Sequence, residues 1–536
     1  MGTPSRRGRK RKSEVVPDKR TSTSSARSKP LMPRKSFVPL SIEQFRPTAV
    51  GTRVLSCGEG EQLGHPNRNT TKKPRAVGTF PTDMTFVQVA AGGVHSLVLT
   101  TDGRVFSCGI NEKGTVPVQG LEAEGTTDTF SEIVFTTDIQ RLGKIVQITA
   151  GASFSAALTE KGSVIAWGNL RDTQGEVNVH ETLTDIQKKP MVVMRHKNKQ
   201  NCHIVKIAAG ENHLAMLSNE GQILTFGEGS MGQLGRSVRT EHIRARYMVD
   251  ESGASLTLRV LEHKQFVRFV NIWARGFWTI GRAEDGRLFV CGLNNFGQLG
   301  VPPQSPAHRK SAAGTSDEDD GGIGPPKPKS PATIAAGQEE SNKVALLTCA
   351  TAFPADKRWT HVAGVQHVIC RSGDDSQIYG IGKNTDNALG LDTWQGNHDE
   401  EHWRYDTLQH IPLPDGVNAV AGVDATLGAT IFWTDDGRVF GFGCDTVGQL
   451  GLGIKEEDEK VVSKPRQITS AHLDGYRVLG VSIADNHALF LAASIDQQPP
   501  LPSASPPPPQ QQKAQQHQQL QTNGNGILET PIDGKA

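Results

Sequence analysis

The first stretch that could do chemistry is a glycine-rich loop. Residues 226–236 read FGEGSMGQLGR, and Gly227, Gly229 and Gly232 have the G-x-G-x-x-G spacing of loops that cradle nucleotide phosphates. The phrase recurs as SCGEGEQLG, VCGLNNFGQLG and GFGCDTVGQLG, with a degenerate copy in GIGKNTDNALG. A phosphate-binding loop also opens a helix, and no helical pattern follows Gly232. The glycines therefore indicate a tight turn in a repeated β-unit, and we expect no cofactor.

The repeated unit is best seen in IVQITAGASFSAALTEKGSVIAWG, residues 145–168. Residues 145–149 alternate like a strand, Ala150 and Gly151 make a turn, and two further short strands flank the hairpin turn EKG. Related copies start near residues 86, 204, 269, 359, 418 and 478. The sequence therefore contains seven β-units in a row.

The seventh unit is cut short, and its missing part lies at the other end of the chain. It ends after its second strand near residue 492, whereas TRVLSCGEGEQLG at residues 52–64 supplies a lone third strand and turn. An open solenoid would not need such a split repeat, but a ring would. We therefore predict an all-β, seven-bladed β-propeller over residues 46–495, closed by pairing of N-terminal and C-terminal strands.

Three segments fall outside the blades. Residues 1–45 are basic and rich in Ser, Thr and Pro, residues 302–343 form a low-complexity insertion, and residues 496–536 form a Pro/Gln-rich tail. We predict that all three are disordered. The chain contains no long apolar run, so no membrane partner is expected.

The basic segment carries its charge in one run, RRGRKRK. Such a run is typical of a nuclear localisation signal read by an import receptor, and it can also contact DNA phosphates. A solubilising tail is the alternative. The candidate residues are Arg6, Arg7, Arg9, Lys10, Arg11 and Lys12.

The repeats resemble the regulator of chromosome condensation family. The resemblance rests on the recurring AG-x-x-H-(S/L)-x-x-L-(T/S)-x-x-G core and on GQLG, and it covers about residues 50–494. It implies the propeller fold strongly. It implies function only weakly, because adaptors and ubiquitin ligases also carry such propellers.

One segment is more specific. After the second unit, WGNLRDTQGEVNVHE at residues 167–181 replaces the usual turn. In the founding member of the family, an exchange factor for the GTPase Ran, a similar W-G-x-x-R-D-x-x-G opens a β-wedge that presses on the GTPase. The resemblance places Arg171 and Asp172 at the base of the wedge and Gly175 at its turn. An irregular loop is the alternative.

A second implied site is the loop Gly210-Glu211-Asn212-His213. The acid that the family uses for exchange maps onto Asn212, and the residue before it is Glu211, so that the two types are swapped. A second family acid maps onto Ala152. Our hypothesis is that Glu211 supplies the missing carboxylate, with Asn212 and His213 beside it.

Histidines recur at one point of several units. They look like metal ligands, but blades that radiate around an axis hold them apart, so we expect structural, hydrogen-bonded side chains and no metal site. Two of them also match partner-facing positions of the family and are retained as further candidate contacts for Ran. The histidines are His95, His213, His367 and His487, and the two candidate contacts are His367 and His487.

The stretch RSVRTEHIRARYMVD at residues 236–250 interrupts the usual passage to the next unit. In the founding member of the family, this place carries a loop whose arginines dock on the acidic patch of the nucleosome. Arg239, Arg244 and Arg246 are the candidates here, because guanidinium groups suit carboxylate clusters. A solvated loop is the alternative.

The leading interpretation is a chromatin-bound exchange factor for Ran in the nucleus, which supports nuclear transport and mitosis without covalent chemistry. Its partners would be Ran, nucleosomal histones and DNA, and an import receptor. The alternative is a propeller scaffold of the same family that binds chromatin or another protein and has no exchange activity. The wedge residues favour the first, and Asn212 and Ala152 favour the second.

Overall fold

The computed structural model describes residues 37–171, 181–195, 202–236, 260–262, 265–302 and 342–496, and those from Pro39 onward belong to one compact unit. Most of the three segments predicted to be disordered lies outside the described residues, so these assignments stay predictions. Among the described residues, no helix is long and apolar enough to cross a membrane.

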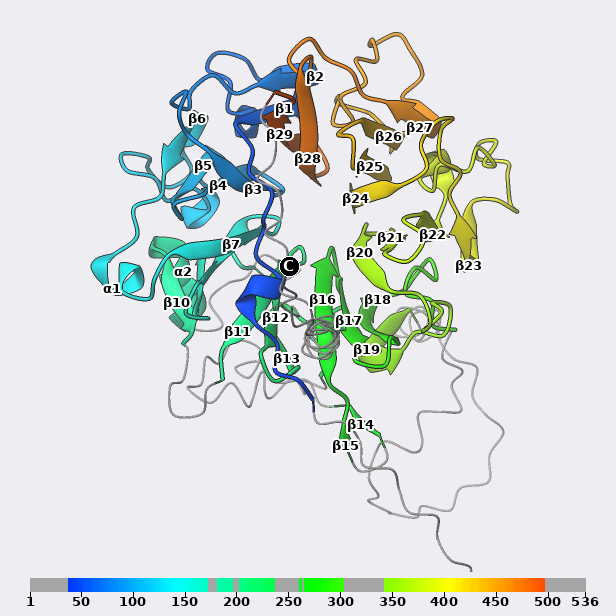
Figure 1. Cartoon of the computed structure of the whole chain (residues 1–536), viewed down its shortest axis with the longest axis horizontal. Coiled ribbons are helices and arrows are strands. Elements are labelled where there is room, and N and C mark those ends of the chain that lie inside the picture. The colour runs from blue at the N-terminus through cyan, green and yellow to red at the C-terminus, as the bar shows by residue number, and fades with distance from the viewer. Residues whose placement is uncertain are drawn as a thin grey trace, which may run out of the picture. The chain divides into compact units, whose positions relative to one another are not determined.

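Within the described residues, antiparallel strands form seven sheets that surround a central axis as the blades of a propeller (Figure 1). The innermost strands of the blades are β3 (Phe86–Ala91), β7 (Ile145–Ala150), β11 (Ile204–Ala209), β16 (Phe269–Arg275), β20 (Trp359–Ala363), β24 (Val420–Ala425) and β28 (Tyr476–Ile483). The second strands are β4 (His95–Thr100), β8 (Phe154–Thr159), β12 (His213–Ser218), β17 (Trp278–Ala283), β21 (His367–Ser372), β25 (Ala429–Thr434) and β29 (His487–Ser494).

The third and outer strands complete the blades. The third strands are β5 (Val105–Ile110), β9 (Val164–Gly168), β13 (Ile223–Gly227), β18 (Leu288–Leu293), β22 (Ile378–Lys383), β26 (Val439–Cys444) and β1 (Arg53–Glu59). The outer strands are β6 (Thr126–Glu132), β10 (Met191–Met194), β19 (Lys343–Cys349), β23 (Arg404–His410), β27 (Val461–Gln467) and β2 (Thr70–Ala76). The third blade has three strands within the described residues. We number the blades in chain order from β3 and call the last one the closing blade.

Short elements connect the blades. The helices are α1 (Thr137–Gln140) and α2 (Glu181–Lys188), the 3-10 turns are η1 (Ile42–Gln44), η2 (Glu61–Leu63), η3 (Glu112–Gly114) and η8 (Thr385–Asn387), and β14 (Leu261–Glu262) pairs with β15 (Gln265–Phe266).

The closing blade joins the two ends of the ring. Its strand order is β2-β1-β29-β28, and β1 pairs with β29 from Arg53 opposite Ala492 to Gly58 opposite His487. The seven-bladed propeller and its closure by N-terminal and C-terminal strands are therefore confirmed.

The sequences of the second strands do not alternate between apolar and polar residues, and the structure explains why. HSLVLT in β4, FSAALT in β8 and HLAMLS in β12 are buried at every position. Each blade lies between two others, so both faces of its second strand are covered and both sets of side chains become apolar or small.

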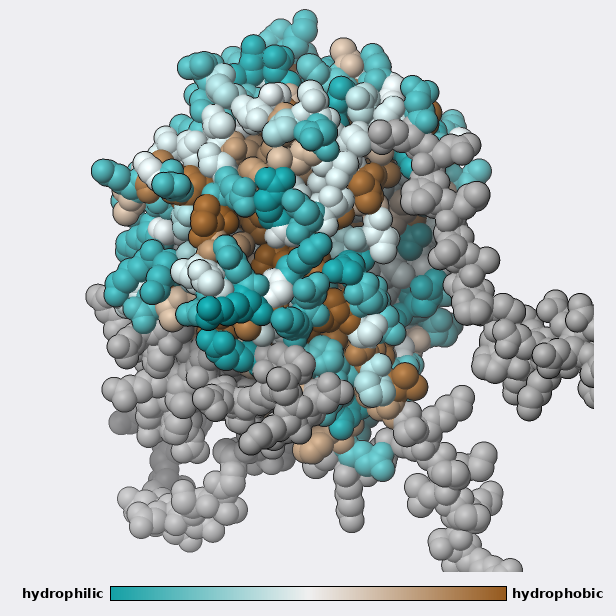
Figure 2. Space-filling model, turned by 60° about the vertical axis from the view of Figure 1, so that its left-hand side comes forward, coloured by the Kyte–Doolittle hydropathy of each residue, from teal (hydrophilic) through white to brown (hydrophobic). Residues whose placement is uncertain are grey.

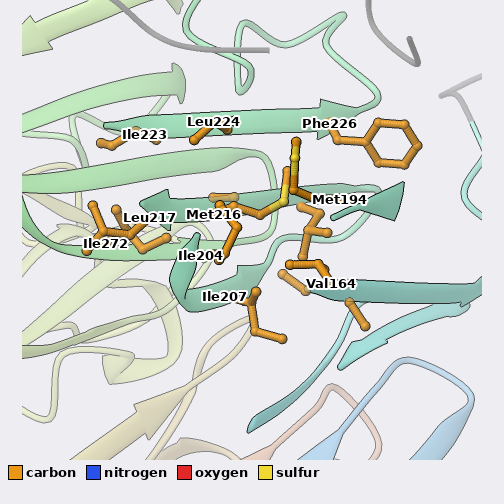
Figure 3. Packing of buried hydrophobic residues seen from close by; sticks show 14 of the residues in the cluster. Val164, Met194, Ile204, Ile207, Met216, Leu217, Ile223, Leu224, Phe226 and Ile272 are labelled. Carbon is orange, nitrogen blue, oxygen red and sulfur yellow. The ribbon is translucent and has the colours of Figure 1, made fainter. Parts of the chain in front are cut away.

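The hydrophobic core consists of layers between blades. Figure 3 shows one such layer, in which Val164 of β9, Met216 of β12 and Ile272 of β16 come from three successive blades. Each fully buried aliphatic side chain contributes roughly 1.5–3 kcal/mol by leaving water. Outside the core, hydrophilic residues cover much of the surface in Figure 2, with hydrophobic patches between them.

The stretch before β1 runs across the ring toward β11 (Figure 1). The amide of Leu40 donates to the carbonyl of Asn219 at 2.8 Å, and Ile42 is 8% exposed within the core layer of the second to fourth blades. The boundary of the basic tail predicted at residue 45 falls inside this packed stretch. We call residues 40–45 the strap.

A glycine at the closing pair offers a test of the ring. Gly58 has φ +114°, and an added Cβ would lie 2.2 Å from the carbonyl oxygen of Asn486. We expect Gly58→Ala to lower the free energy of unfolding by at least about 2 kcal/mol, because the strained backbone and the clash act together. Gly78→Ala is the matched control, since an added Cβ there has open space. Urea unfolding followed by tryptophan fluorescence measures both, and equal midpoints would contradict this account of closure.

Candidate functional site

Short loops that join the first and second strands surround the axis on one face of the ring. They fall on the same face because every first strand runs in the same direction past the axis. The loops are residues 92–94, 151–153, 210–212, 276–277, 364–366, 426–428 and 484–486.

These loops bind one another through their backbones. The amide of Gly93 donates to the carbonyl of Gly151 at 3.1 Å, and that of Ala152 to the carbonyl of Glu211 at 2.8 Å. The amide of Glu211 in turn donates to the carbonyl of Gly276 at 2.7 Å. A chain of hydrogen bonds therefore connects the first four blades and leaves these loops little freedom to move.

The loops enclose a hollow on the axis. Most of its lining is glycine and alanine, and its charged side chains are Glu211, Arg275 and Asp485. Burial raises the pKa of the Glu211 carboxyl, and the negative charge of Asp485 raises it further, whereas the positive charge of Arg171 opposes both. Two carboxylates near each other in a partly buried hollow form a site that attracts a cationic group of a partner.

Of the three candidate exchange residues Glu211, Asn212 and His213, only Glu211 lines this axial hollow. Asn212 is 5% exposed and its side-chain oxygen has no hydrogen-bond partner among the described residues. His213 is fully buried. This geometry agrees with the hypothesis that Glu211 replaces the family acid, although the exchange role of all three residues stays a prediction.

Arg275 crosses the hollow and was missed by the sequence analysis. It comes from the fourth blade, and its Nε donates to the carbonyl of Ala425 at 3.2 Å. Its Nη2 lies 3.4 Å from Asp424 Oδ2 and also donates to the carbonyl of Ile483. Arg275 thus connects the fourth blade to the sixth and the closing blade. Alignment of the repeats would have shown it, because Arg275 stands where the third unit has Gly210.

The base of the predicted wedge is held by one carboxylate. Glu112 of η3 forms an ion pair with Arg171 at 2.8 Å, accepts a hydrogen bond from Asn169 Nδ2 at 2.9 Å and accepts another from the hydroxyl of Ser153. Gln187 of α2 donates to Asn169 at 3.1 Å. Arg171 keeps 38% of its side chain exposed, so it is fixed and still accessible.

The remaining predicted site residues lie outside the described residues. These are Asp172 and Gly175 of the wedge, Arg239, Arg244 and Arg246 of the following loop, and the basic run from Arg6 to Lys12.

A family model described as RCC1-like domain matches residues 53–490. The chain belongs to the RCC1-like domain family. Regulator of chromosome condensation of Homo sapiens is 28% identical over 452 residues, which cover 83% of this chain and 91% of the human protein. Guanine nucleotide exchange factor SRM1 of Saccharomyces cerevisiae is 26% identical over 73% of this chain and 77% of the yeast protein.

A solved structure of the family has the same fold. The crystal structure of Prp20p from Saccharomyces cerevisiae matches with a TM-score of 0.67 at 19% identity, and the match covers 91% of this chain and all of that chain. The resemblance predicted from the repeats is thus confirmed, and so is the fold it implied.

The recurrent histidines of this RCC1-like propeller connect neighbouring blades. Each Nε2 faces a hydroxyl at the start of the next blade's second strand, and the four side chains have no exposed surface. The pairs are His95 and Ser155 at 2.6 Å, His213 and Thr279 at 2.9 Å, His367 and Thr430 at 3.3 Å, and His487 and Ser96 at 2.8 Å.

The direction of two of these bonds follows from the hydroxyl groups. Ser96 donates to the carbonyl of Gln62 at 2.7 Å and Thr279 to that of Gln233 at 2.9 Å, so each must accept from its histidine. The expected structural role is thus observed. The burial of His367 and His487 gives no support to a direct contact with Ran, which stays a prediction. Among the described residues, no three potential ligands gather for a metal.

Burial of the histidines makes the stability of the ring sensitive to acid. Burial lowers the pKa to about 3 for His95, His213 and His487, and to about 4 for His367. In the unfolded chain each takes up a proton below its ordinary pKa of about 6.5. The unfolded state therefore binds more protons from about pH 6.5 down to about pH 4, and stability falls as the pH falls through this range.

His213→Phe tests this coupling, because the second blade has Phe154 at the same place. Between pH 7.5 and pH 5, the unfolding free energy of both proteins should fall. We expect the fall in the variant to be up to about 2 kcal/mol smaller than the fall in the parent. Urea unfolding at the two pH values measures the difference. His398→Phe, at an exposed histidine, is the control. Identical pH dependence in parent and His213→Phe would show that this histidine does not carry the effect.

Proposed function

We propose that this protein is a guanine-nucleotide exchange factor for the small GTPase Ran. The observation that carries the proposal is the wedge base, where Glu112 fixes an accessible Arg171 close enough to the axial hollow for its charge to act on Glu211. The similarity to Guanine nucleotide exchange factor SRM1 and to Regulator of chromosome condensation supports it.

Exchange requires binding energy rather than covalent chemistry. The factor must bind the nucleotide-free GTPase more tightly than the nucleotide-bound form, and this difference drives nucleotide release. A wedge displaces a loop of its partner only if its own support does not yield. The hydrogen-bonded loops of the axial hollow and the ion pair of Glu112 with Arg171 supply that support.

Charge would orient the GTPase on this face. Glu211 and Asp485 present carboxylates at the axial hollow, and they favour a partner with basic groups opposite them. Arg275 keeps the neighbouring Asp424 paired, so that carboxylate is not offered to a partner.

The chromatin and nuclear parts of the proposal rest on other residues. The run from Arg6 to Lys12 would contact DNA and an import receptor, and Arg239, Arg244 and Arg246 would contact histones. Prp20p offers a parallel, because its structure was described together with its binding to Gsp1p and histones. Another yeast structure shows Kap60 bound to Prp20. The protein would then act in the nucleus, in nuclear transport and mitosis.

The alternative is a family scaffold without exchange activity. Asn212 and Ala152 stand where the family has acids, and Asn212 is buried. If Glu211 does not replace them, the axial face would bind a partner without promoting nucleotide release.

Release of a fluorescent GDP analogue from purified Ran separates the two functions. We expect the protein to accelerate release by orders of magnitude, and Glu211→Gln to lower kcat at least tenfold because the carboxylate acts on the charge of its partner. Arg171→Ala should lower it as well. Glu43→Gln, an exposed glutamate of η1 that does not line the hollow, is the control. No acceleration by the parent would favour the scaffold, and an unaffected Glu211→Gln beside an inactive Arg171→Ala would refute the role of Glu211.

Glu112 is expected to act only through the wedge base. Glu112→Gln should lower the exchange rate by weakening the ion pair with Arg171. The double variant Glu112→Gln/Arg171→Ala should be no slower than Arg171→Ala alone, because the two residues act as one unit. Additive losses in this cycle would show instead that Glu112 has a separate role.

A further inference from the structure

A groove on the outer rim of the closing blade gathers basic side chains. It is lined by β2, by the turn before it, and by loops near Gly453 and Ser470 that flank β27. Its basic residues are Arg68, Lys72, Lys73, Arg75 and His472.

Most of these cations lack a carboxylate partner. Lys72 pairs with Glu456 at 3.2 Å, and that glutamate side chain is 89% exposed. Arg68, Lys73 and Arg75 form no ion pair with any described residue. The groove therefore holds uncompensated positive charge that a bound anion would neutralise.

The positive charge of the groove affects the pKa of a buried histidine, His65. His65 is 5% exposed, and its Nε2 is 2.8 Å from the hydroxyl of Ser56. Burial, then the positive charges of Arg75, Arg68 and His472, lower its pKa to about 4. Three basic residues from two separate chain segments therefore lie close enough together to act on one group.

Protection of a sheet edge explains only part of this arrangement. β2 is the outer strand of its sheet, and Lys73 and Pro74 are residues that keep such strands from pairing with another chain. The corresponding strand β6 carries Asp128 and Glu132 instead, so an edge of this ring needs no positive charge. Edge protection also leaves Arg68 and His472 unexplained, because neither belongs to β2.

The exposed cations of the groove suit an extended polyanion. Lys73 and Arg75 are exposed residues of β2 on either side of the buried Pro74, next to the irregularity where the pairing with β1 shifts between Gly58 and Ser56. Thr71, which is 8% exposed, also lines the groove, and its hydroxyl has no partner among the described residues. We propose that this groove binds the phosphate backbone of duplex DNA. The proposal deepens the chromatin part of the proposed function and is independent of nucleotide exchange.

The test is binding of a short, labelled, mixed-sequence DNA duplex to the full chain at several salt concentrations. The variant Arg68→Ser/Lys73→Ser/Arg75→Ser should bind more weakly. The slope of its log Kd against log salt concentration should be smaller by about 2.7, because three phosphate contacts are lost. The control Arg46→Ser/Arg141→Ser/Lys161→Ser removes the same charge outside the groove. Equal loss of affinity and slope in the two triple variants would overturn the proposal.

Two further experiments test the same proposal. Glu456→Gln should strengthen DNA binding severalfold, because it frees Lys72 and removes a nearby negative charge; unchanged or weaker binding would contradict the proposal. Inorganic pyrophosphate at constant ionic strength should not displace the duplex, and displacement would instead indicate a site for a compact anion. Exchange on Ran should be the same in the parent and the groove variant, so that failure of the exchange function is seen separately.

Discussion

The pairing of β1 with β29 is the constraint on which the rest of the structure depends. A blade of this protein has no core of its own, because its apolar side chains fill the layers between blades, as those of the second, third and fourth blades do. Each layer therefore needs a partner on both sides, and the first and last blades obtain theirs only when the ring closes. Closure converts seven weak sheets into one cooperative body.

The candidate site depends on the rigidity of the closed ring. Loops from successive blades share backbone hydrogen bonds around the axis, and Arg275 connects blades that are not neighbours. The four recurrent histidines add one bond at each of four interfaces in the buried layer just behind these loops. Arg171, the accessible arginine at the base of the predicted wedge, is then fixed relative to the carboxylate of Glu211, although neither residue belongs to a long or independently stable element.

The sequence predicts the fold well because the fold is local and repeated. Strand order, turn glycines and the split seventh unit are all visible as patterns within short windows. The site is less accessible to such reasoning. Glu112 and Arg171 meet across two blades, and Arg275 reaches residues about half the ring away, so no spacing along the chain reveals these contacts. The burial of Asn212 could not be predicted either, because it depends on how its loop packs against the neighbouring ones.

The closing pair also sets the timing of folding during synthesis. Arg53 is among the first residues of the ring to leave the ribosome, and its partner Ala492 among the last. At typical rates of translation, β1 waits on the order of 20–90 s for β29. Throughout this time β1 is paired with β2 along one edge only, and its other edge can pair with another molecule. The strap contacts the third blade, which is complete long before the last strand exists, so the N-terminal stretch has an attachment on the partial ring before closure.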